Sequence, residues 1–226
     1  MAELKFIKRI ENAPDVYSFI FEKPNDFSWI AGQFTQITFP HDNPDDRGIK
    51  RFFSISSAPF EKIIMVTSRI EIKSSSSFKK AFYDIKPDTL VECTEPRGKL
   101  VVTRQDKKII LIAGGIGITP IRSIILDLDY NNKLQNTDLI YSNRDDALPF
   151  KNDFEVKKEE NPTFNIFYFV SPERICEETI DKIYSTFPDC YVFISGPPGL
   201  VKSVEDLFIL KGIPSESIRT DYFPGY

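Results

Sequence analysis

One stretch of this chain, from Lys108 to Arg122, constrains the fold more than any other. It reads K-I-I-L-I-A-G-G-I-G-I-T-P-I-R, an aliphatic and β-branched run followed by three glycines. Apolar residues then recur at the spacing of one helical face: Ile121, Ile124, Ile125 and Leu128. Thr119 suits an N-cap, and Pro120 suits the first helical position, where a missing N–H has no cost. The stretch therefore predicts a strand, a glycine turn and a helix.

The glycine turn indicates a place where a ligand meets the backbone. Glycines let a ligand approach closely, and a helix N-terminus offers unpaired N–H groups and a partial positive charge to a phosphate. We therefore predict a cradle for the pyrophosphate of a dinucleotide. An ordinary tight turn of an α/β domain is the alternative, because G-x-G-x-T-P differs in its last position from the G-x-G-x-x-G fingerprint.

The first hundred residues have the pattern of an antiparallel β-barrel. Short β-rich runs are separated by clusters of Pro, Asn, Asp and Gly. These runs are L-K-F-I-K-R-I, V-Y-S-F-I-F-E, F-T-Q-I-T-F, R-F-F-S-I-S-S, K-I-I-M-V-T-S-R-I and T-L-V-E-C-T. One helix, F-K-K-A-F-Y-D-I, follows a serine run at Ser74–Ser77 that can cap it. We predict a barrel domain over residues 1–104.

After residue 104 the period of the apolar residues changes. Strand-like runs alternate with helical faces, which predicts a parallel sheet with helices on both faces over residues 105–226. The strands are K-I-I-L-I, D-L-I-Y-S, N-I-F-Y-F-V-S and C-Y-V-F-I-S, and the helical faces begin at Ile121, Ile180 and Leu200. The glycine turn follows the first of these strands, where such sheets bind ligands.

Composition excludes several classes of function. A net charge of -4 argues against nucleic acid as the main partner, because phosphate-binding surfaces are normally basic. We find no apolar run of membrane-spanning length and no signal peptide, so we expect a cytoplasmic protein without a membrane partner. The three cysteines, Cys93, Cys176 and Cys190, are too far apart for a disulfide framework or a metal site, and we expect core thiols and no metal. His41 lies in a polar loop and receives no role.

Four short motifs have residue types suited to a bound nucleotide. Arg51 in R-F-F-S-I-S-S-A-P can pair with a phosphate beside aromatics that stack on a flat ring, or be a surface arginine on a barrel strand. The serines of S-S-S-S-F-K-K can bind phosphate or merely cap a helix. The turn I-S-G-P-P-G-L can approach a nucleotide or simply stiffen the chain. The aromatics of T-D-Y-F-P-G-Y can cover a planar cofactor or pack on the domain.

Taken in order, these motifs resemble the ferredoxin-NADP reductase superfamily of flavoenzymes. The series is R-F-F-S-I-S-S-A-P, S-x-F-K-K-A-F, E-P-R-G-K-L, A-G-G-I-G-I-T-P-I-R-S, Y-S-N-R-D-D-A-L-P-F, I-S-G-P-P and D-Y-F-P-G-Y. The resemblance runs from Ala31 to Tyr226, and the order of motifs is more specific than any one of them.

The resemblance implies a set of residues around a flavin. Arg51 is expected to bind the flavin pyrophosphate, Phe53 to stack on the isoalloxazine where tyrosine is usual, and Ser54 to lie near flavin N5. Ser76 is expected to contact the FAD pyrophosphate from the helix start. The other residues that we expect at the flavin are Thr67, Arg69, Ser77, Phe223 and Tyr226, with one of the last two aromatics lying over the ring.

The resemblance also implies a nicotinamide nucleotide site. Gly115, Gly117 and Thr119 are expected to hold the nucleotide. Further expected contacts are Gly196 and Pro197 below the nicotinamide and Ser142, Asn143 and Arg144 near the adenosine ribose. We expect Ser54, Ser195 and Asp221 to act in catalysis.

This chain departs from the family pattern at three positions. Ser195 stands where many members have cysteine, Asp221 where glutamate is common, and the usual glycine before Asp88 is missing. A hydroxyl must therefore serve in place of a thiol, and the placement of the helix after Ser74–Ser77 is less certain from sequence.

The resemblance implies an FAD-dependent NAD(P)H oxidoreductase. Hydride is expected to pass from the nicotinamide to flavin N5, and electrons then to a separate redox protein such as a ferredoxin or flavodoxin, from a monomer or homodimer. A reductase that uses flavin as a diffusing substrate and a non-catalytic nucleotide-binding electron-transfer subunit are the alternatives. The choice between NADH and NADPH stays open, because Arg144 can meet a 2′-phosphate or pair with Asp145 or Asp146.

Overall fold

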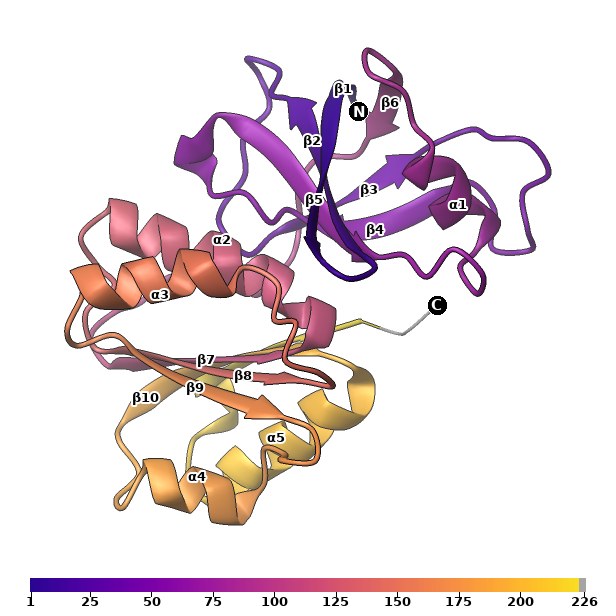
Figure 1. The fold of residues 1–226 in the computed structure, drawn as a ribbon. Helices are drawn as coiled ribbons and strands as arrows, with labels where there is room; N and C mark the ends of the chain where they lie inside the picture. The colour runs from indigo at the N-terminus through magenta and orange to yellow at the C-terminus, as the bar shows by residue number, and fades with distance from the viewer. Residues whose placement is uncertain (224–226) are drawn as a thin grey trace.

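The computed structural model describes residues 1–223, and this part of the chain forms two sheets in separate layers (Figure 1). The N-terminal layer is an antiparallel six-stranded sheet in the order β4-β3-β6-β1-β2-β5. Its strands are β1 (Ala2–Ala13), β2 (Val16–Glu22), β3 (Phe34–Thr38), β4 (Lys50–Ser54), β5 (Ile63–Arg69) and β6 (Leu90–Cys93). Each strand falls on one of the six β-rich runs, so the predicted barrel strands are confirmed.

The two outer strands of this sheet meet and close it into a barrel. Just beyond β4, Ile55 forms an antiparallel bridge with Val66 of β5, and the Ser56 amide donates to the Met65 carbonyl at 2.7 Å. The interior is filled mainly by aromatic and branched side chains. Helix α1 (Ser77–Tyr83) covers one end, where Phe78 and Phe82 are fully buried. Its N-cap is Ser76, which confirms the predicted capping by the serine run.

The C-terminal layer is a parallel sheet with helices on both faces, as predicted. In residues 1–223 its strand order is β11-β10-β7-β8-β9. The strands are β7 (Lys108–Gly114), β8 (Thr137–Asn143), β9 (Asn165–Val170), β10 (Cys190–Gly196) and β11 (Ile218–Tyr222). Helices α2 (Ile118–Tyr130) and α3 (Lys151–Glu160) lie on the face toward the barrel, and α4 (Glu177–Ile183) and α5 (Pro198–Leu210) on the other (Figure 1).

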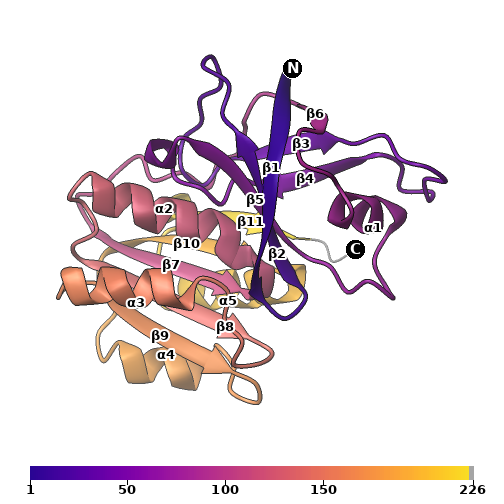
Figure 2. The ribbon, with the colours of Figure 1, turned by 45° about the horizontal axis from the view of Figure 1, so that its top comes forward.

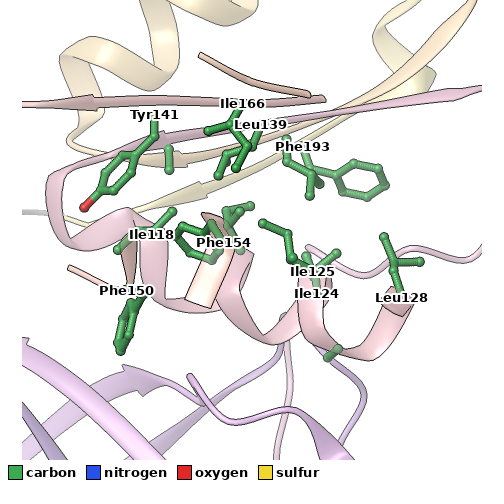
Figure 3. Packing of buried hydrophobic residues seen from close by; sticks show 14 of the residues in the cluster. Ile118, Ile124, Ile125, Leu128, Leu139, Tyr141, Phe150, Phe154, Ile166 and Phe193 are labelled. Carbon is green, nitrogen blue, oxygen red and sulfur yellow. The ribbon is translucent and has the colours of Figure 1, made fainter. Parts of the chain in front are cut away.

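Helix α2 holds the two layers together. Figure 3 shows Ile125 of this helix on the side of the sheet that carries Leu139, whereas the Ile124 side chain lies next to Gly32 on the barrel side. The same buried cluster also includes four barrel-side residues: Ile20, Ala31, Met65 and Leu100. The segment 94–107 joins the sheets, and we keep residue 104 within it as the proposed domain boundary. No helix of the described chain is long and apolar enough to cross a membrane.

Several local expectations were wrong. Helix α2 begins at Ile118, directly after a 3-10 turn over Gly115–Gly117, so Thr119 is not the N-cap; its hydroxyl instead donates to the Ile116 carbonyl at 3.0 Å. Helix α3 and strand β11 were not predicted. Only Phe154 is buried on α3, and the five residues of β11 are mostly polar, so neither shows a clear apolar period. Cys176 is exposed, whereas Cys93 and Cys190 are buried thiols.

Candidate functional site

A cleft of about 1120 Å³ separates the barrel from the carboxyl ends of the parallel strands. Its walls include residues of β4, β5 and α1 on one side and the ends of β7, β8 and β11 on the other. The end of β11 runs toward α1 (Figure 2). The predicted site residues that line the cleft are Arg51, Phe53, Ser54, Arg69, Gly115, Ser142, Asn143, Arg144, Pro197, Asp221 and Phe223.

Arg51 forms the cationic floor of the barrel side. The residue is buried, and its Nη1 donates to the carbonyl oxygens of Arg47 at 2.8 Å, Gly48 at 3.0 Å and Lys50 at 2.7 Å. Its guanidinium also lies over the Phe78 ring, and its Nη2 is 3.5 Å from an Asp45 carboxylate oxygen. These contacts hold a permanent positive charge at the cleft, where an anion would be attracted.

Asp45, which sequence analysis left in an unassigned polar loop, ties that loop to the start of α1. Its carboxylate accepts from the Ser77 amide at 3.0 Å, and its own amide donates to the Ser77 hydroxyl at 2.8 Å. The hydrogen bond from the Ser77 amide lowers the pKa of Asp45 to about 2, with further help from Arg47. His41, given no role, is half-buried and lies 3.0 Å from the same hydroxyl.

Two serines predicted at the flavin, of which Ser76 was expected at the pyrophosphate, form hydrogen bonds within the protein instead. Ser76 is buried and accepts from the Lys79 amide at 3.3 Å, and the Ser77 hydroxyl is taken up by Asp45 and His41. Neither lines the cleft, whereas Ser74, Ser75 and Lys79 do. The reason is that N-capping turns the Ser76 hydroxyl back onto its own helix. Lys79, within the S-x-F-K-K motif, was the residue that sequence reasoning passed over.

Lys79 and Arg69 add to the positive charge near Arg51. The Lys79 ammonium donates to the Arg69 carbonyl at 3.0 Å. Burial, and then the neighbouring charge of Arg51, lower the pKa of Lys79, as expected where cations lie close together. An anionic group in the cleft would relieve that repulsion.

Thr67 is the predicted flavin residue that the structure places away from the cleft. Its hydroxyl lies 2.6 Å from the Ser18 hydroxyl and 2.9 Å from that of Ser56, in a buried network inside the barrel. Successive side chains of a strand point to opposite faces, so its neighbour Ser68 lines the cleft instead. The structure therefore does not bring Thr67 to the cleft with the other expected flavin residues.

Aromatic rings bracket Ser54 on β4. Phe53 stacks on Phe82 with ring centroids 5.5 Å apart, and one edge of it remains at the cleft. Phe52 points to the opposite face and is half exposed, with the Arg97 guanidinium 5.2 Å from its ring centre. Both residues contribute to the lining of the cleft, so the wall beside Ser54 is apolar.

The glycine turn forms the opposite wall. Gly115 and Ile116 line the cleft, while Gly117 is buried against the end of β10. A Cβ atom on Gly117 would lie 2.3 Å from the Ser195 carbonyl oxygen, so the close approach of turn and strand requires glycine. Thr119 and Gly196 are likewise behind the lining surface rather than in it.

Ser142 and Asn143 end β8, Arg144 follows it, and all three line the cleft. The Asn143 amide donates to the Asp145 carbonyl at 3.0 Å. Arg144 reaches across to the barrel, where its Nη2 is 3.2 Å from a Glu71 carboxylate oxygen, and its Nε pairs with Asp145 at 3.2 Å. The structure therefore shows the pairing of Arg144 with Asp145, one of the two alternatives, together with a pairing to Glu71 that sequence did not indicate.

Ser195 and Asp221 lie side by side because β10 and β11 pair them in register. The Ser195 hydroxyl is fully buried and has no hydrogen-bond partner among the described residues. Burial raises the pKa of Asp221 to about 6. The Phe223 amide donates to the Gly196 carbonyl at 2.9 Å, which carries the chain on into the cleft. Tyr226 lies outside the described residues.

Comparisons with known proteins agree with this architecture. A family described as the ferric reductase NAD binding domain matches residues 106–189. Flavohemoprotein A of Dictyostelium discoideum is 25% identical over 96% of the chain, which covers 58% of that protein. The chain spans about half the length of the first curated relatives it matches.

Two solved structures have the same fold over nearly their whole length. A ferredoxin NADP+ reductase from Neisseria gonorrhoeae with bound FAD and NADP superposes with a TM-score of 0.82 at 16% identity, covering 98% of both chains. The flavohem-like FAD/NAD binding domain of nitric oxide dioxygenase from Vibrio cholerae gives 0.82 at 17% identity, covering 99% of this chain and 98% of the other. The chain therefore shares the two-domain fold of these two FAD- and NAD(P)-binding proteins, which agrees with the resemblance that the order of its motifs indicated.

Proposed function

We propose that this protein is an FAD-dependent NAD(P)H oxidoreductase that passes electrons to a redox protein. One observation carries the proposal: a single cleft of about 1120 Å³ has the Arg51–Ser54 wall on one side and the glycine turn with Asp221 on the other. A cleft of this size exceeds the usual volume for one small ligand and leaves room for two nucleotides. Each wall has the groups that one nucleotide requires.

The barrel wall fits FAD. Arg51, Lys79 and Arg69 gather positive charge that a pyrophosphate would neutralise, and Arg51 is held rigidly by three carbonyls. The apolar face at Phe53 suits a flat ring, and the Ser54 hydroxyl lies beside it. When bound, FAD supplies the ability to accept a hydride and to release electrons singly. The protein's part is to hold and orient the two rings and to exclude water.

The opposite wall fits the nicotinamide nucleotide. The turn at Gly115 exposes backbone at the start of α2, and Gly117 allows that turn to lie against β10. Asp221, which is half-buried, lines this wall, and the buried Ser195 lies behind it in the paired strand. Below pH 6 the Asp221 carboxyl holds a proton, and above it the carboxylate accepts hydrogen bonds, so this pair can orient an amide group in either state.

The acceptor is proposed to be a ferredoxin, a flavodoxin or another redox protein. The relative solved from Neisseria gonorrhoeae is a ferredoxin NADP+ reductase, and the flavohemoprotein relative carries a haem-protein name. Both names support single-electron transfer to a protein-bound centre.

An absorption spectrum of the purified protein, followed by anaerobic NADH or NADPH, tests the proposal. We expect a yellow protein with about one FAD per chain that survives gel filtration and is bleached by one or both nucleotides. Flavin that is lost on gel filtration but reduced when added back would favour the reductase with diffusing flavin. A protein that neither takes up FAD nor responds to NAD(P)H would contradict the proposal.

A further inference from the structure

A buried arginine joins the two walls of the cleft by a route that is separate from the cleft itself. Arg122 lies on α2, one turn beyond Ile118, where the glycine turn becomes helix. The residue is 8% exposed and does not line the cleft. The partners of this guanidinium come from both sides of the domain interface.

On the barrel side, Arg122 binds the chain that follows β4. Its Nη1 donates to the Ser56 carbonyl at 2.9 Å and to a Glu61 carboxylate oxygen at 2.9 Å, and its Nη2 donates to the second Glu61 oxygen at 3.2 Å. Glu61 is itself fixed by the Ala58 amide, which donates to its carboxylate at 2.6 Å. The neighbouring Ser123 hydroxyl donates to the Ser57 carbonyl at 2.7 Å.

On its own domain, Arg122 is held from α3. Its Nε donates to Asp153 at 2.8 Å, and its guanidinium lies 5.1 Å from the centre of the Phe150 ring. Every nitrogen of the guanidinium thus donates a hydrogen bond. The planar fork matches a carboxylate with two parallel bonds, which a lysine ammonium cannot reproduce.

Arg122 is therefore only a few residues from each half of the site. Ser56 follows Ser54 by two residues along the barrel strand, and Arg122 follows Gly117 by five along the turn and helix. The apolar contacts between α2 and the barrel attract without direction, whereas the fork admits one orientation. The guanidinium of Arg122 consequently constrains the position of one wall of the cleft relative to the other.

We propose that Arg122 is a positioning residue that fixes the distance and angle between the flavin and nicotinamide walls. The expected effect of Arg122 on turnover rests on the proposed function. Productive transfer needs the reacting atoms about 3 to 3.5 Å apart, and a misplacement of about 1 Å costs on the order of 100-fold in rate. The arginine touches neither nucleotide. Its loss should slow transfer between bound nucleotides without emptying either site.

The test compares Arg122→Lys with the wild type and with Arg104→Lys, an exposed arginine that pairs with Asp106 outside the cleft. Arg122→Lys keeps the charge but loses the fork. We expect about one FAD per chain, as in the wild type, and anaerobic flavin bleaching by NAD(P)H about 10- to 100-fold slower at saturating nucleotide. Arg104→Lys should match the wild type in both.

A second experiment measures the distance between the two domains in protein without bound nucleotide. Spin labels at Glu92→Cys on the barrel and Lys182→Cys on α4, both exposed, report the distance between the layers in a background where exposed Cys176 is serine. We expect one narrow distance in the wild type and a broader or shifted one in Arg122→Lys. If Arg122→Lys does not fold, Glu61→Gln removes the same pairing while keeping the side-chain shape, and takes its place.

The outcomes separate the two proposals. An unchanged distance distribution in the variant overturns the positioning role, and so does a broadened distribution with an unchanged bleaching rate. The first of these outcomes includes the case in which Arg122→Lys slows flavin bleaching while the distance between the labels is unchanged. If wild-type protein is not bleached by NAD(P)H at all, the proposed function fails, and the label distances alone still decide whether Arg122 sets the arrangement of the walls.

Discussion

At the scale of single residues, the cleft depends on charges that the protein has taken out of water. Arg51 and Asp221 are the two clearest cases, one on each wall. Arg51 is held by carbonyl oxygens and Asp45, whereas the Asp221 carboxyl sits in a desolvated position beside the Ser195 hydroxyl. Substitution of Arg51 and substitution of Asp221 should therefore have different effects. Contacts within the protein stabilise the charge of Arg51, whereas burial disfavours the charged form of Asp221.

Arg51→Ala should weaken FAD binding by about 1 to 3 kcal/mol, because a charge-assisted hydrogen bond to the pyrophosphate is lost. That corresponds to roughly a 5- to 150-fold rise in the Kd for FAD, measured by titrating flavin-free protein and following flavin fluorescence. Arg104→Ala, an exposed arginine outside the cleft, should bind FAD as the wild type does. Equal FAD affinity in both variants would show that Arg51 does not hold the flavin.

Asp221→Asn should change the dependence of stability on pH. With its pKa raised to about 6 by burial, the folded protein retains a proton on Asp221 between pH 4 and 6 that the unfolded chain releases. The contribution of the Asp221 carboxyl to the free energy of unfolding is therefore fully present below about pH 4 and is lost as the pH rises through 6. Asparagine has no proton to lose, so the variant should gain on the order of 2 kcal/mol relative to wild type at pH 7 but not at pH 4.

Thermal unfolding at the two pH values measures this effect. Asp84→Asn, at an exposed carboxylate after α1, serves as the matched control and should show no such difference between pH 4 and 7. A variant at position 221 that tracks the wild type at both pH values would mean that the carboxyl is not desolvated in the folded protein.

At the scale of elements, the glycine turn and the β10–β11 pair form one unit. Gly117 lies so close to β10 that no side chain fits between them, and β11 brings Asp221 to Ser195 by register. Packing against the neighbouring strand β10, rather than the residues of the turn itself, therefore sets the position of the turn at the start of α2.

Gly117→Ala tests this packing. Its φ of -61° suits alanine, so any loss is steric: the new methyl would lie 2.3 Å from the Ser195 carbonyl oxygen. We expect stability to fall by about 1 to 3 kcal/mol and nicotinamide nucleotide binding to fall at least about tenfold, with FAD content unchanged. Denaturant unfolding and nucleotide titration measure the two effects.

Gly199→Ala is the control for the glycine substitution. Nothing lies within 4 Å of a Cβ there, and the residue is helical, so the unfolding midpoint should stay the same or rise. Loss of FAD from Gly117→Ala with nicotinamide binding intact would mean that the two walls have been assigned to the wrong nucleotides.

At the scale of the whole molecule, the two layers share one buried cluster. The apolar face of α2 packs on the parallel sheet (Figure 3). Ile20, Met65 and Leu100 on the barrel side belong to the same cluster. A shared core couples the stability of the two layers. We therefore expect the barrel and the α/β layer to unfold in one transition.

Ile124→Ala should lower the stability of both layers together, by about 2 to 5 kcal/mol, because it opens a cavity in the shared cluster. The single tryptophan, Trp29, is buried in the barrel core, so its fluorescence reports the barrel while far-ultraviolet circular dichroism reports the whole protein. Both midpoints should fall equally. Ile209→Ala, at an exposed isoleucine, should leave them unchanged, and an unshifted Trp29 midpoint in Ile124→Ala would show that the layers unfold independently.

Much of this protein could be predicted from local sequence alone. The alternating runs in residues 1–104 and the helical periods after them specify the barrel strands and the α/β order, because strands and amphipathic helices bury side chains at fixed periods. The motif A-G-G-I-G-I-T-P predicted the glycine turn before α2, and the motif R-F-F-S predicted the wall that contains Arg51. Elements without an apolar period, namely α3 and β11, were missed for the same reason.

The tertiary structure alone decided which side chains reach the cleft. Thr67 faces the barrel interior and Ser76 caps its own helix, while Lys79 joins Arg51 and Asp45 fixes the loop beside it. Arg122 was invisible as a functional residue, since its partners Ser56 and Glu61 lie more than sixty residues away in sequence. Local sequence determines the period of each element, but strand pairing, capping and long-range ion pairs depend on which surfaces meet after the chain has folded.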